Sequence, residues 1–436
     1  MPKSIIMVEG IQEKLMEKLR FKVYEHKIIY TENRLLKRNF IVLSDETGIV
    51  GWTMFHEYIK TGKRKRVKNL SQDDRVRFYN VVKLLNYAFF DKYCINNLND
   101  LSKEIVRNFL NDYGLLRLPD DSKDVVRNKV TVDRCVVHII DFLEEYIRNN
   151  EKSTLKNEDI FKTMEVFSKR RKRYFEKKIP SFDVYCSSES HPIFRDIPEN
   201  VFKILMNNIV EKHRNLLMMA ALEAFAGLRP SEGCNVRRVD SPLGPGLRFE
   251  RIGEEVTGVF IDLTREQNLR SDLKSVGNIK KKRTQRVYPA FVSSFCECYE
   301  LYMKYIKGKK YEADYAPLSV GINGKALTYQ AYYAGFKKVV KECIPLMLES
   351  DDPEVVNYGN LLLENNISPH IFRHWFSVKL TLFGEDVSGL MYWRGDKDPQ
   401  SALTYIMNKG DLEKQYKKVS DAIFDYSLWK AEKIYK

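Results

Sequence analysis

The sequence predicts a mainly α-helical protein with a small β-sheet, an α+β fold of more than one domain. Its 436 residues suggest two or three domains at about 150 residues each. Hydrophobic residues make up 44% and aromatic residues 12%, which excludes a largely disordered chain. Apolar residues recur with the helical period along most of the chain. The longest nearly apolar stretch, Leu216–Leu228, is shorter than the roughly 20 residues that cross a bilayer, so we expect a cytoplasmic protein without membrane attachment.

Residues 1–58 are expected to form a small α+β unit. A helix-like stretch at Ile11–Leu19 precedes a region rich in β-branched and aromatic residues, in which Asp45–Gly48 is a turn candidate. The unit is either an accessory domain or an extension that pads the helices after it.

Residues 59–178 are expected to form a helical domain. Four segments have helical periodicity, and Ser102 is a candidate N-cap for the second of them. The segments are Asp73–Tyr93, Leu101–Tyr113, Thr131–Ile147 and Asn157–Phe167. Pro180 and Pro192 flank a polar stretch that disfavours a continuous helix, so residues 179–190 are predicted to end a linker.

Residues 191–436 are expected to form the largest domain. Strand-like sequence occurs at Gly246–Leu263 and Asn278–Pro289. The predicted helices are Pro198–His213, Arg214–Leu228, Ala290–Ile306, Thr328–Ile344, Pro369–Leu382, Gln400–Met407 and an amphipathic tail within Asp411–Lys436.

The net charge of +14 is concentrated in three short segments. Thr61–Lys68, Phe167–Lys178 and Asn278–Arg286 together carry +16 in 29 residues, so the other 407 residues sum to about −2. Such clusters favour contact with the phosphates of a nucleic acid, whose binding should weaken steeply with salt. The candidate phosphate contacts are Lys63, Arg64, Lys65, Arg66, Lys169, Arg170, Arg171, Lys172, Arg173, Lys280, Lys282 and Arg283.

Three motifs of the last domain are informative together. The first is AGLRPSE, Ala226–Glu232, in which an apolar helix ends at a glycine that precedes an arginine. The second is PHIFRH, Pro369–His374, which places a histidine and an arginine three residues apart on one side of a helix start, a cationic pair suited to phosphate. The third is Arg-Gly-Asp396, followed nine residues later by Tyr405.

In order and spacing these motifs resemble those of the tyrosine recombinases, the phage-type integrases and Xer-like recombinases. The family patterns are approximately TGLRxxE, PHxLRH and LGH with a tyrosine nine residues on, and NIKKKRTQRVYP resembles the family's lysine-bearing β-hairpin. The resemblance covers about residues 195–415 and implies a catalytic domain at 191–436 that follows a helical core-binding domain. It further implies that residues 1–58 could be an arm-type DNA-binding domain.

The resemblance implies a role for each motif residue in metal-free and ATP-free phosphodiester transfer. Tyr405 would be the nucleophile that forms a 3′-phosphotyrosyl link, and Arg229 and Arg373 would clamp the phosphate oxygens. His370 would handle a proton or bind the phosphate. Lys281 would protonate the 5′ leaving oxygen, although Lys280 and Lys282 suit that step equally well. Glu232 would buttress Arg229 or a neighbouring helix.

Asp396 departs from the family pattern because that position normally holds His or Trp. A carboxylate beside a phosphate is repulsive unless it is protonated or turned away. Trp393 could fill the space if the loop is shifted, and His374 is another base nearby.

The sequence thus predicts a site-specific recombinase, the integrase of a mobile element, with double-stranded DNA as its partner. The resemblance implies four protomers at a synapse and leaves room for an accessory DNA-bending or excision factor. Two alternatives stay open. One is a DNA-binding relative with impaired cleavage, marked by Asp396, and the other is a type IB topoisomerase-like enzyme that relaxes DNA.

Overall fold

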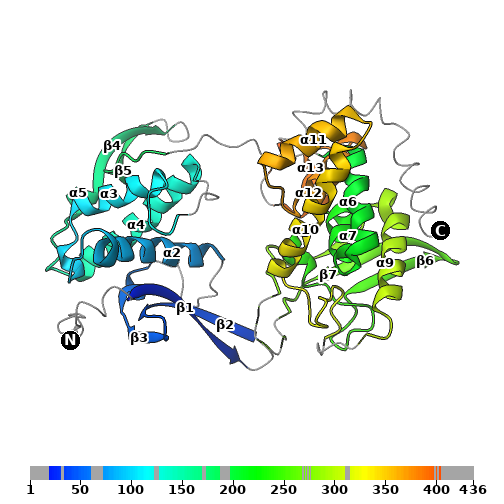
Figure 1. Ribbon diagram of the computed structural model, residues 1–436, viewed down its shortest axis with the longest axis horizontal. Helices are drawn as coiled ribbons and strands as arrows, with labels where there is room; N and C mark the ends of the chain where they lie inside the picture. The colour runs from blue at the N-terminus through cyan, green and yellow to red at the C-terminus, as the bar shows by residue number, and fades with distance from the viewer. Residues whose placement is uncertain are drawn as a thin grey trace. The chain divides into compact units, whose positions relative to one another are not determined.

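A computed structural model describes residues 19–30, 34–59, 72–121, 127–168, 173–186, 197–267, 270, 272, 274, 276–309, 315–396, 399 and 402–403. The chain divides into two compact units, Met1–Pro192 and Ile193–Lys436, and each is described by itself (Figure 1). Several predicted features lie outside the described residues. These are most of the helix at Ile11–Leu19, the basic residues Lys63–Arg66 and Lys169–Lys172, Tyr405, and the tail Asp411–Lys436.

The first unit begins with a three-stranded antiparallel sheet of β1 (Arg20–Tyr30), β2 (Arg34–Ser44) and β3 (Ile49–Trp52). The predicted turn is confirmed, since the Asp45 carboxylate accepts hydrogen bonds from the backbone of Thr47 and Gly48. Phe21 is buried in the same apolar core as the helices that follow. Its backbone N–H also donates to the Asn86 side chain at 2.8 Å. This sheet therefore extends the core of the helical region.

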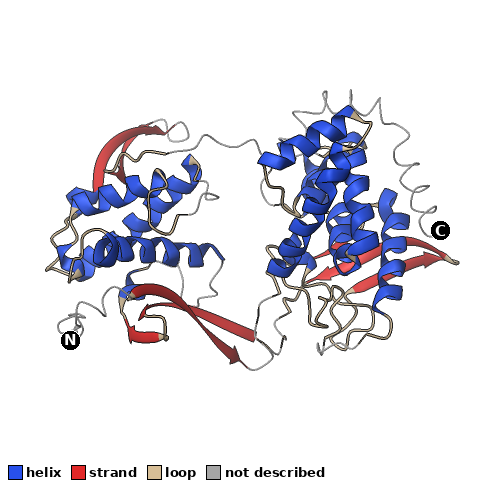
Figure 2. Cartoon of the chain, viewed as in Figure 1, coloured by secondary structure: helices blue, strands red, loops and turns tan. Residues whose placement is uncertain are grey.

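Three long helices form the body of the first unit, as the sequence predicts. They are α2 (Gln72–Asn86), α3 (Lys103–Gly114) and α4 (Lys129–Asn149). A π-helical turn at Tyr87–Asp91 and a 3₁₀ turn at Leu98–Asp100 lie between α2 and α3. The Ser102 hydroxyl accepts from the backbone N–H of Ile105, which confirms it as the N-cap of α3. Figure 2 shows these helices in blue, with the two sheets of this unit in red.

The predicted fourth helix is wrong. Only α5 (Asn157–Ile160) is helical, and the chain then forms an antiparallel hairpin of β4 (Phe161–Ser168) and β5 (Arg173–Pro180). Apolar, aromatic and β-branched residues recur along Phe161–Phe167, and pairing with β5 stabilises the extended form over the helix. The segment predicted to end a linker, residues 179–190, begins within the first unit. Strand β5 continues to Pro180, and Phe182 is buried in the core of that unit.

The second unit packs helices against a small antiparallel sheet (Figure 1). The sheet has the order β6 (Leu247–Ile252), β7 (Glu255–Leu263) and β8 (Arg283–Arg286), within the predicted strand segments. The predicted helices are observed as α6 (Glu199–Lys212), α7 (Leu217–Ala226), α9 (Val292–Ile306), α10 (Tyr329–Leu348) and α12 (Ile371–Leu382). Three helices were not predicted: α8 (Pro230–Gly233), α11 (Pro353–Glu364) and α13 (Val387–Arg394).

The sheet of the second unit has one apolar face and one polar face. Val259 and Ile261 of β7 point into the core, where β7 contacts α9, and Phe260 and Asp262 alternate with them on the outer face. Helix α7 is buried on all sides, which explains its continuous run of apolar residues. The fold class, mainly helical with small β-sheets, is therefore as predicted. No helix among the described ranges combines the length and the apolar character that crossing a membrane requires.

Glu223 is the single ionisable residue of the buried helix α7. Its burial should make the stability of the protein depend on pH. Its side chain is fully buried, and burial raises its pKa well above the usual value, an effect that neighbouring Tyr332 and Arg373 offset only in part. The folded protein thus keeps this proton while the unfolded chain releases it above about pH 4.5, so the contribution of Glu223 to stability falls as pH rises. We expect Glu223→Gln to raise the free energy of unfolding at pH 8 and to raise it much less at pH 4.5.

The measurement is urea unfolding of both proteins at the two pH values. Glu342→Gln is the matched control, because the hydrogen bond with His213 lowers the pKa of that exposed carboxyl. The control should gain no stability at pH 8. A Glu223→Gln protein that is equally destabilised at both pH values would contradict a protonated Glu223.

Candidate active site

Arg229 is positioned by the end of helix α7. Gly227 caps that helix with φ +62°, and a Cβ atom there would lie 2.4 Å from the Phe376 ring, so the position requires glycine on both grounds. Two residues later Arg229 is the N-cap residue of α8, where its backbone N–H donates to the Glu232 carboxylate at 3.2 Å. Its guanidinium also donates to Glu232, from Nη1 at 3.1 Å. Glu232 therefore buttresses Arg229.

His370 and Arg373 lie at the start of α12. Arg373 is 1% exposed, and its Nη1 donates to the carbonyl of Gly227, which ties α12 to the end of α7. Burial, with Arg394 and Arg229 nearby, lowers the pKa of Arg373 to about 9, so it is protonated at neutral pH. Burial and the charges of Arg373 and its neighbours lower the pKa of His370 to about 3, so its imidazole is neutral at pH 7. The His370 and His374 rings meet edge to face at 5.1 Å.

Asp396 comes directly after Gly395, which ends helix α13 in the left-handed backbone conformation. Gly395 has φ +62°, and a Cβ there would lie 2.5 Å from Nε of Arg283, so no larger residue fits. Arg394, the last residue of α13, is buried and donates from Nη1 to the Ser377 hydroxyl of α12 at 2.8 Å. The Arg394–Asp396 segment is thereby held against the middle of α12.

The three helix ends meet at the Asp396 carboxylate. Oδ1 accepts from Nη2 of Arg229 at 2.5 Å and from Nη2 of Arg373 at 2.8 Å. Oδ2 lies 2.9 Å from Nε of Arg394. The sequence motifs that carry Arg229, Arg373 and Asp396 are thus brought to one point.

Strand β8 contributes a fourth arginine to this cluster. Arg283 forms an ion pair with the fully buried Glu232 at 3.0 Å and 3.2 Å, and its side chain is 10% exposed. Burial opposes ionisation of Glu232, but the hydrogen bond and charge of Arg283, with Arg229 and Arg373, outweigh it and lower its pKa. Arg283, which the sequence suggests as a DNA contact, here faces inward and pairs with Glu232.

Four arginines of the cluster meet two carboxylates. Arg229, Arg283, Arg373 and Arg394 pair with Asp396 and Glu232. Guanidinium forks bind the oxygens of phosphate and carboxylate in the same way. The site is therefore suited to an oxyanion that arrives from outside.

The lysine segment enters the sheet just before β8. Lys280 and Lys282 are exposed, whereas Lys281 is half-buried and its carbonyl accepts from Nη1 of Arg283 at 2.9 Å. This bond ties the backbone of Lys281 to the Arg283–Glu232 pair. Of the three candidate lysines, Lys281 is the one whose backbone accepts a hydrogen bond from the cluster.

Trp393 lies in a different environment from Asp396. Its indole N–H donates to the Glu385 carboxylate at 3.1 Å, and its ring packs edge to face on Tyr288 at 4.9 Å. Asp396, rather than Trp393, therefore contacts the two motif arginines.

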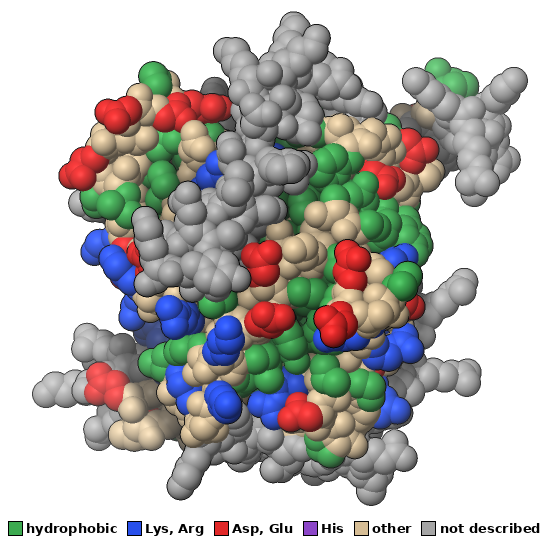
Figure 3. Space-filling view, turned by 90° about the vertical axis from the view of Figure 1, so that its right-hand side faces the viewer, with side chains coloured by type: hydrophobic (Ala, Val, Ile, Leu, Met, Phe, Trp, Pro, Cys, Tyr) green, Lys and Arg blue, Asp and Glu red, His purple; other side chains and the backbone are tan. Residues whose placement is uncertain are grey.

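Other predicted contacts cannot be placed in the cluster. Tyr405 and the residues Lys63–Arg66 and Lys169–Lys172 lie outside the described residues, and of Arg173 only the backbone, at the start of β5, is described. On the face shown in Figure 3, Lys and Arg side chains are interspersed with Asp and Glu. The described surface on this side is thus of mixed charge.

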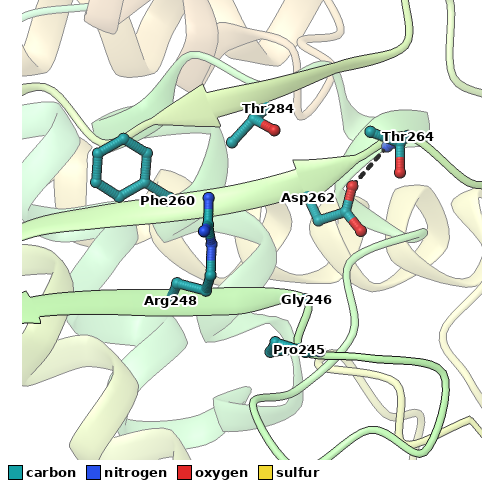
Figure 4. A pocket seen from close by; sticks show the side chains of 7 residues that line it. All are labelled: Pro245, Gly246, Arg248, Phe260, Asp262, Thr264 and Thr284. Carbon is teal, nitrogen blue, oxygen red and sulfur yellow. Dashed lines mark hydrogen bonds between the residues drawn. The ribbon is translucent and has the colours of Figure 1, made fainter.

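A shallow pocket of about 310 Å³ lies on the outer face of the sheet in the second unit (Figure 4). Arg248 of β6 and Arg286 of β8 flank the Phe260 ring of β7, with guanidinium carbons 5.7 Å and 5.3 Å from its centre. Asp262 beside them is paired with Arg237 at 2.5 Å. None of the residues of the arginine cluster lines this pocket.

Sequence reasoning missed Arg394, the inward role of Arg283, and Gln285, which donates to the Trp393 carbonyl at 2.7 Å. A signal for Arg394 was present. The third motif reads Arg-Gly-Asp where the family pattern has Leu-Gly-His. An arginine thus stands in place of the leucine and an aspartate in place of the histidine, and two such opposite charges together indicate an ion pair. The described residues contain no cluster of His, Cys, Asp and Glu that could hold a metal ion.

Comparisons with known proteins find similarity in solved structures alone. No family model matches the chain, and no curated protein matches its sequence. Similar solved structures include the Tn1549 transposon integrase in complex with transposon right end DNA, at 15% identity and a TM-score of 0.47, covering 81% of this chain and 95% of that one. A lambda integrase dimer bound to a core site is similar at 11% identity and a TM-score of 0.45, covering 78% and 90%. The XerH site-specific recombinase bound to its difH substrate is similar at 13% identity and a TM-score of 0.42, covering 76% and 75%.

Proposed function

We propose that the chain is a site-specific DNA recombinase of the tyrosine recombinase family, which breaks and rejoins DNA strands through a 3′-phosphotyrosyl intermediate. The observation that carries the proposal is the convergence of Arg229 and Arg373 on a single oxygen, at 2.5 Å and 2.8 Å. Two motifs far apart in the sequence thereby build one oxyanion site. The neutral imidazole of His370 lies at the start of the helix that carries Arg373.

In the proposed reaction Tyr405 attacks the scissile phosphorus. The bond from its phenolic oxygen to phosphorus forms, and the bond from phosphorus to the 5′ oxygen breaks. The phenolic proton leaves to water, the neutral imidazole of His370 donates a hydrogen bond to the phosphate, and Lys281 gives a proton to the departing 5′ oxygen. Arg229 and Arg373 bind the nonbridging oxygens, where negative charge accumulates. A 5′ hydroxyl of another strand reverses these steps and rejoins the DNA, so the energy of the broken bond is conserved in the covalent link.

The wider features of the proposal follow from the same family resemblance. The enzyme would be the cytoplasmic integrase of a mobile element, act as a tetramer on double-stranded DNA, and use an accessory DNA-bending or excision factor. Exposed Lys280 and Lys282 would contact phosphates beside the cleavage point. Exchange of strands through a covalent link requires no metal ion and no ATP.

Covalent trapping tests the proposal without a known recognition sequence. The protein is incubated with a pool of nicked duplexes that carry a randomised segment, and DNA that stays attached in SDS is recovered and sequenced. We expect the wild type to enrich a defined sequence and Tyr405→Phe to recover none, because phenylalanine lacks the attacking oxygen. Equal recovery by both proteins would contradict the proposal.

The occupied arginine pair favours a second candidate function. Asp396 holds the two groups that would bind the phosphate, as expected of a DNA-binding relative with impaired cleavage. In that case the wild type would enrich a sequence in a non-covalent pull-down of the same pool but leave no DNA attached in SDS. Attachment without sequence preference, with relaxation of supercoiled plasmid, would instead indicate a topoisomerase-like enzyme.

A further inference from the structure

The Asp396 carboxylate is bound as a ligand of the arginine cluster. One oxygen is shared by Arg229 and Arg373 and the other faces Arg394, so three guanidiniums hold a single anionic group. The side chain is 8% exposed. A carboxylate held in this way has the same donors, at the same distances, that a phosphate oxygen would have.

Asp396 also limits access to Arg373. The Arg373 side chain is 1% exposed, whereas Arg229 is 18% exposed. Apart from the Gly227 carbonyl, the described partner of the Arg373 guanidinium is Asp396. An oxyanion from solution can therefore reach Arg229 first, but it reaches Arg373 only after Asp396 moves.

Arg394 supplies a place for the displaced carboxylate. Its guanidinium is held by the Ser377 hydroxyl at 2.8 Å, and that hydroxyl donates in turn to the Arg373 carbonyl at 2.9 Å. Asp396 can leave the other two arginines and remain paired with Arg394, two residues away. The exchange then replaces one anion by another at Arg229 and Arg373 and leaves no buried charge unpaired.

We propose that Asp396 is a built-in substitute for the scissile phosphate, which occupies Arg229 and Arg373 until an incoming phosphate displaces it toward Arg394. The proposal rests on the proposed function for the identity of that phosphate. The pair Arg394–Asp396 is thus an autoinhibitory device: the arginines stay aligned in the absence of DNA, and only a phosphate that is held firmly by the rest of the DNA interface competes for them.

The test measures how tightly the full-length protein binds inorganic sulfate, a tetrahedral dianion. Sulfate is titrated by calorimetry into wild type and Asp396→Ala at constant ionic strength. We expect the variant to bind sulfate at least tenfold more tightly, because the arginine pair is vacant. Asp396→Ala combined with Arg229→Gln should lose that gain. Asp240→Ala, which removes an exposed carboxylate paired with Arg238, is the matched control and should bind sulfate as the wild type does.

A second variant covers the case in which Asp396→Ala does not fold because three arginines lose their counter-charge. Arg394→Leu combined with Asp396→Asn keeps the net charge, and we expect the same increase in sulfate affinity. Folding of Asp396→Ala that is rescued by sulfate would also support the proposal.

Sulfate affinities that are equal in the wild type and in both Asp396 variants would overturn it. This readout needs neither cleavage nor a recognition sequence. If covalent trapping fails, the proposal that Asp396 occupies the arginine pair still stands. If the sulfate affinities are equal, the proposed recombinase activity still stands.

Discussion

Replacing either motif arginine by lysine should lower the rate of covalent DNA attachment by about 100-fold or more. Arg229→Lys and Arg373→Lys keep the positive charge but remove the guanidinium fork, which here donates from Nη1 and Nη2 to two different acceptors. Loss of one donor to a developing oxyanion typically costs about 3 to 4 kcal/mol in a catalysed reaction. A lysine ammonium reaches one acceptor as a point charge and cannot replace both bonds.

The measurement is the single-turnover rate of attachment to a selected nicked duplex. Arg238→Lys is the control, since that arginine also uses its fork on a carboxylate, that of the exposed Asp240. Non-covalent affinity for the same duplex should change much less than the rate, which separates a defect in chemistry from a defect in binding. Wild-type rates for both lysine variants would show that the pair does not act on the phosphate.

The second large effect concerns Glu232, which should be among the most sensitive positions for stability. Its carboxylate is fully buried and accepts from both Arg229 and Arg283, so Glu232→Gln leaves two guanidiniums without their shared counter-charge. Removing one partner of a buried ion pair typically costs about 3–5 kcal/mol. We expect a loss of that size in the free energy of unfolding, measured with urea at pH 7.

Asp240→Asn provides the comparison, because the Asp240–Arg238 pair is exposed and such pairs contribute about 0–1 kcal/mol. The Glu232 defect should also depend on pH. Burial alone would raise the pKa of Glu232, but the arginines lower it, so its stabilising contribution is present above about pH 4.5 and is lost as pH falls further. A Glu232→Gln protein as stable as the wild type at pH 7 would contradict the role of this carboxylate as the buttress of Arg229.

The sequence predicts three of the residues that meet in the candidate site, Arg229, Arg373 and Asp396, and local rules of helix structure account for the two arginines. Gly227 ends a buried helix where a left-handed cap is required, and His370 and Arg373 share one side of a helix start, so local rules already place these side chains. The orientation of Asp396 was not predictable in this way. It depends on Arg229, which is distant in sequence, and the expected repulsion assumed that the phosphate is already present.

Two errors in the predicted fold also arise from contacts that local sequence does not show, and a third from a local signal that was not used. The prediction of a helix and a basic linker at the β4–β5 hairpin is wrong because pairing between the two strands decides their conformation, and this pairing is not visible in the sequence of either strand alone. Helix α11 was overlooked although its start carries recognisable signals, with Asp352 as N-cap and Pro353 at the first helical position. Arg283 stands in a run of lysines, which suggests a DNA contact, whereas the alternation of β8 turns it toward Glu232.

The central claim, that Tyr405 becomes covalently joined to DNA in the site built by Arg229 and Arg373, is tested most directly by locating the bond. The covalent complex recovered from the nicked duplex pool is digested with protease and nuclease, and the nucleotide-bearing peptide is sequenced by mass spectrometry. The account predicts a nucleotide attached through its 3′ phosphate to Tyr405, with no such peptide from Arg373→Lys under the same conditions. Attachment at any other residue, or through a 5′ phosphate, would contradict it.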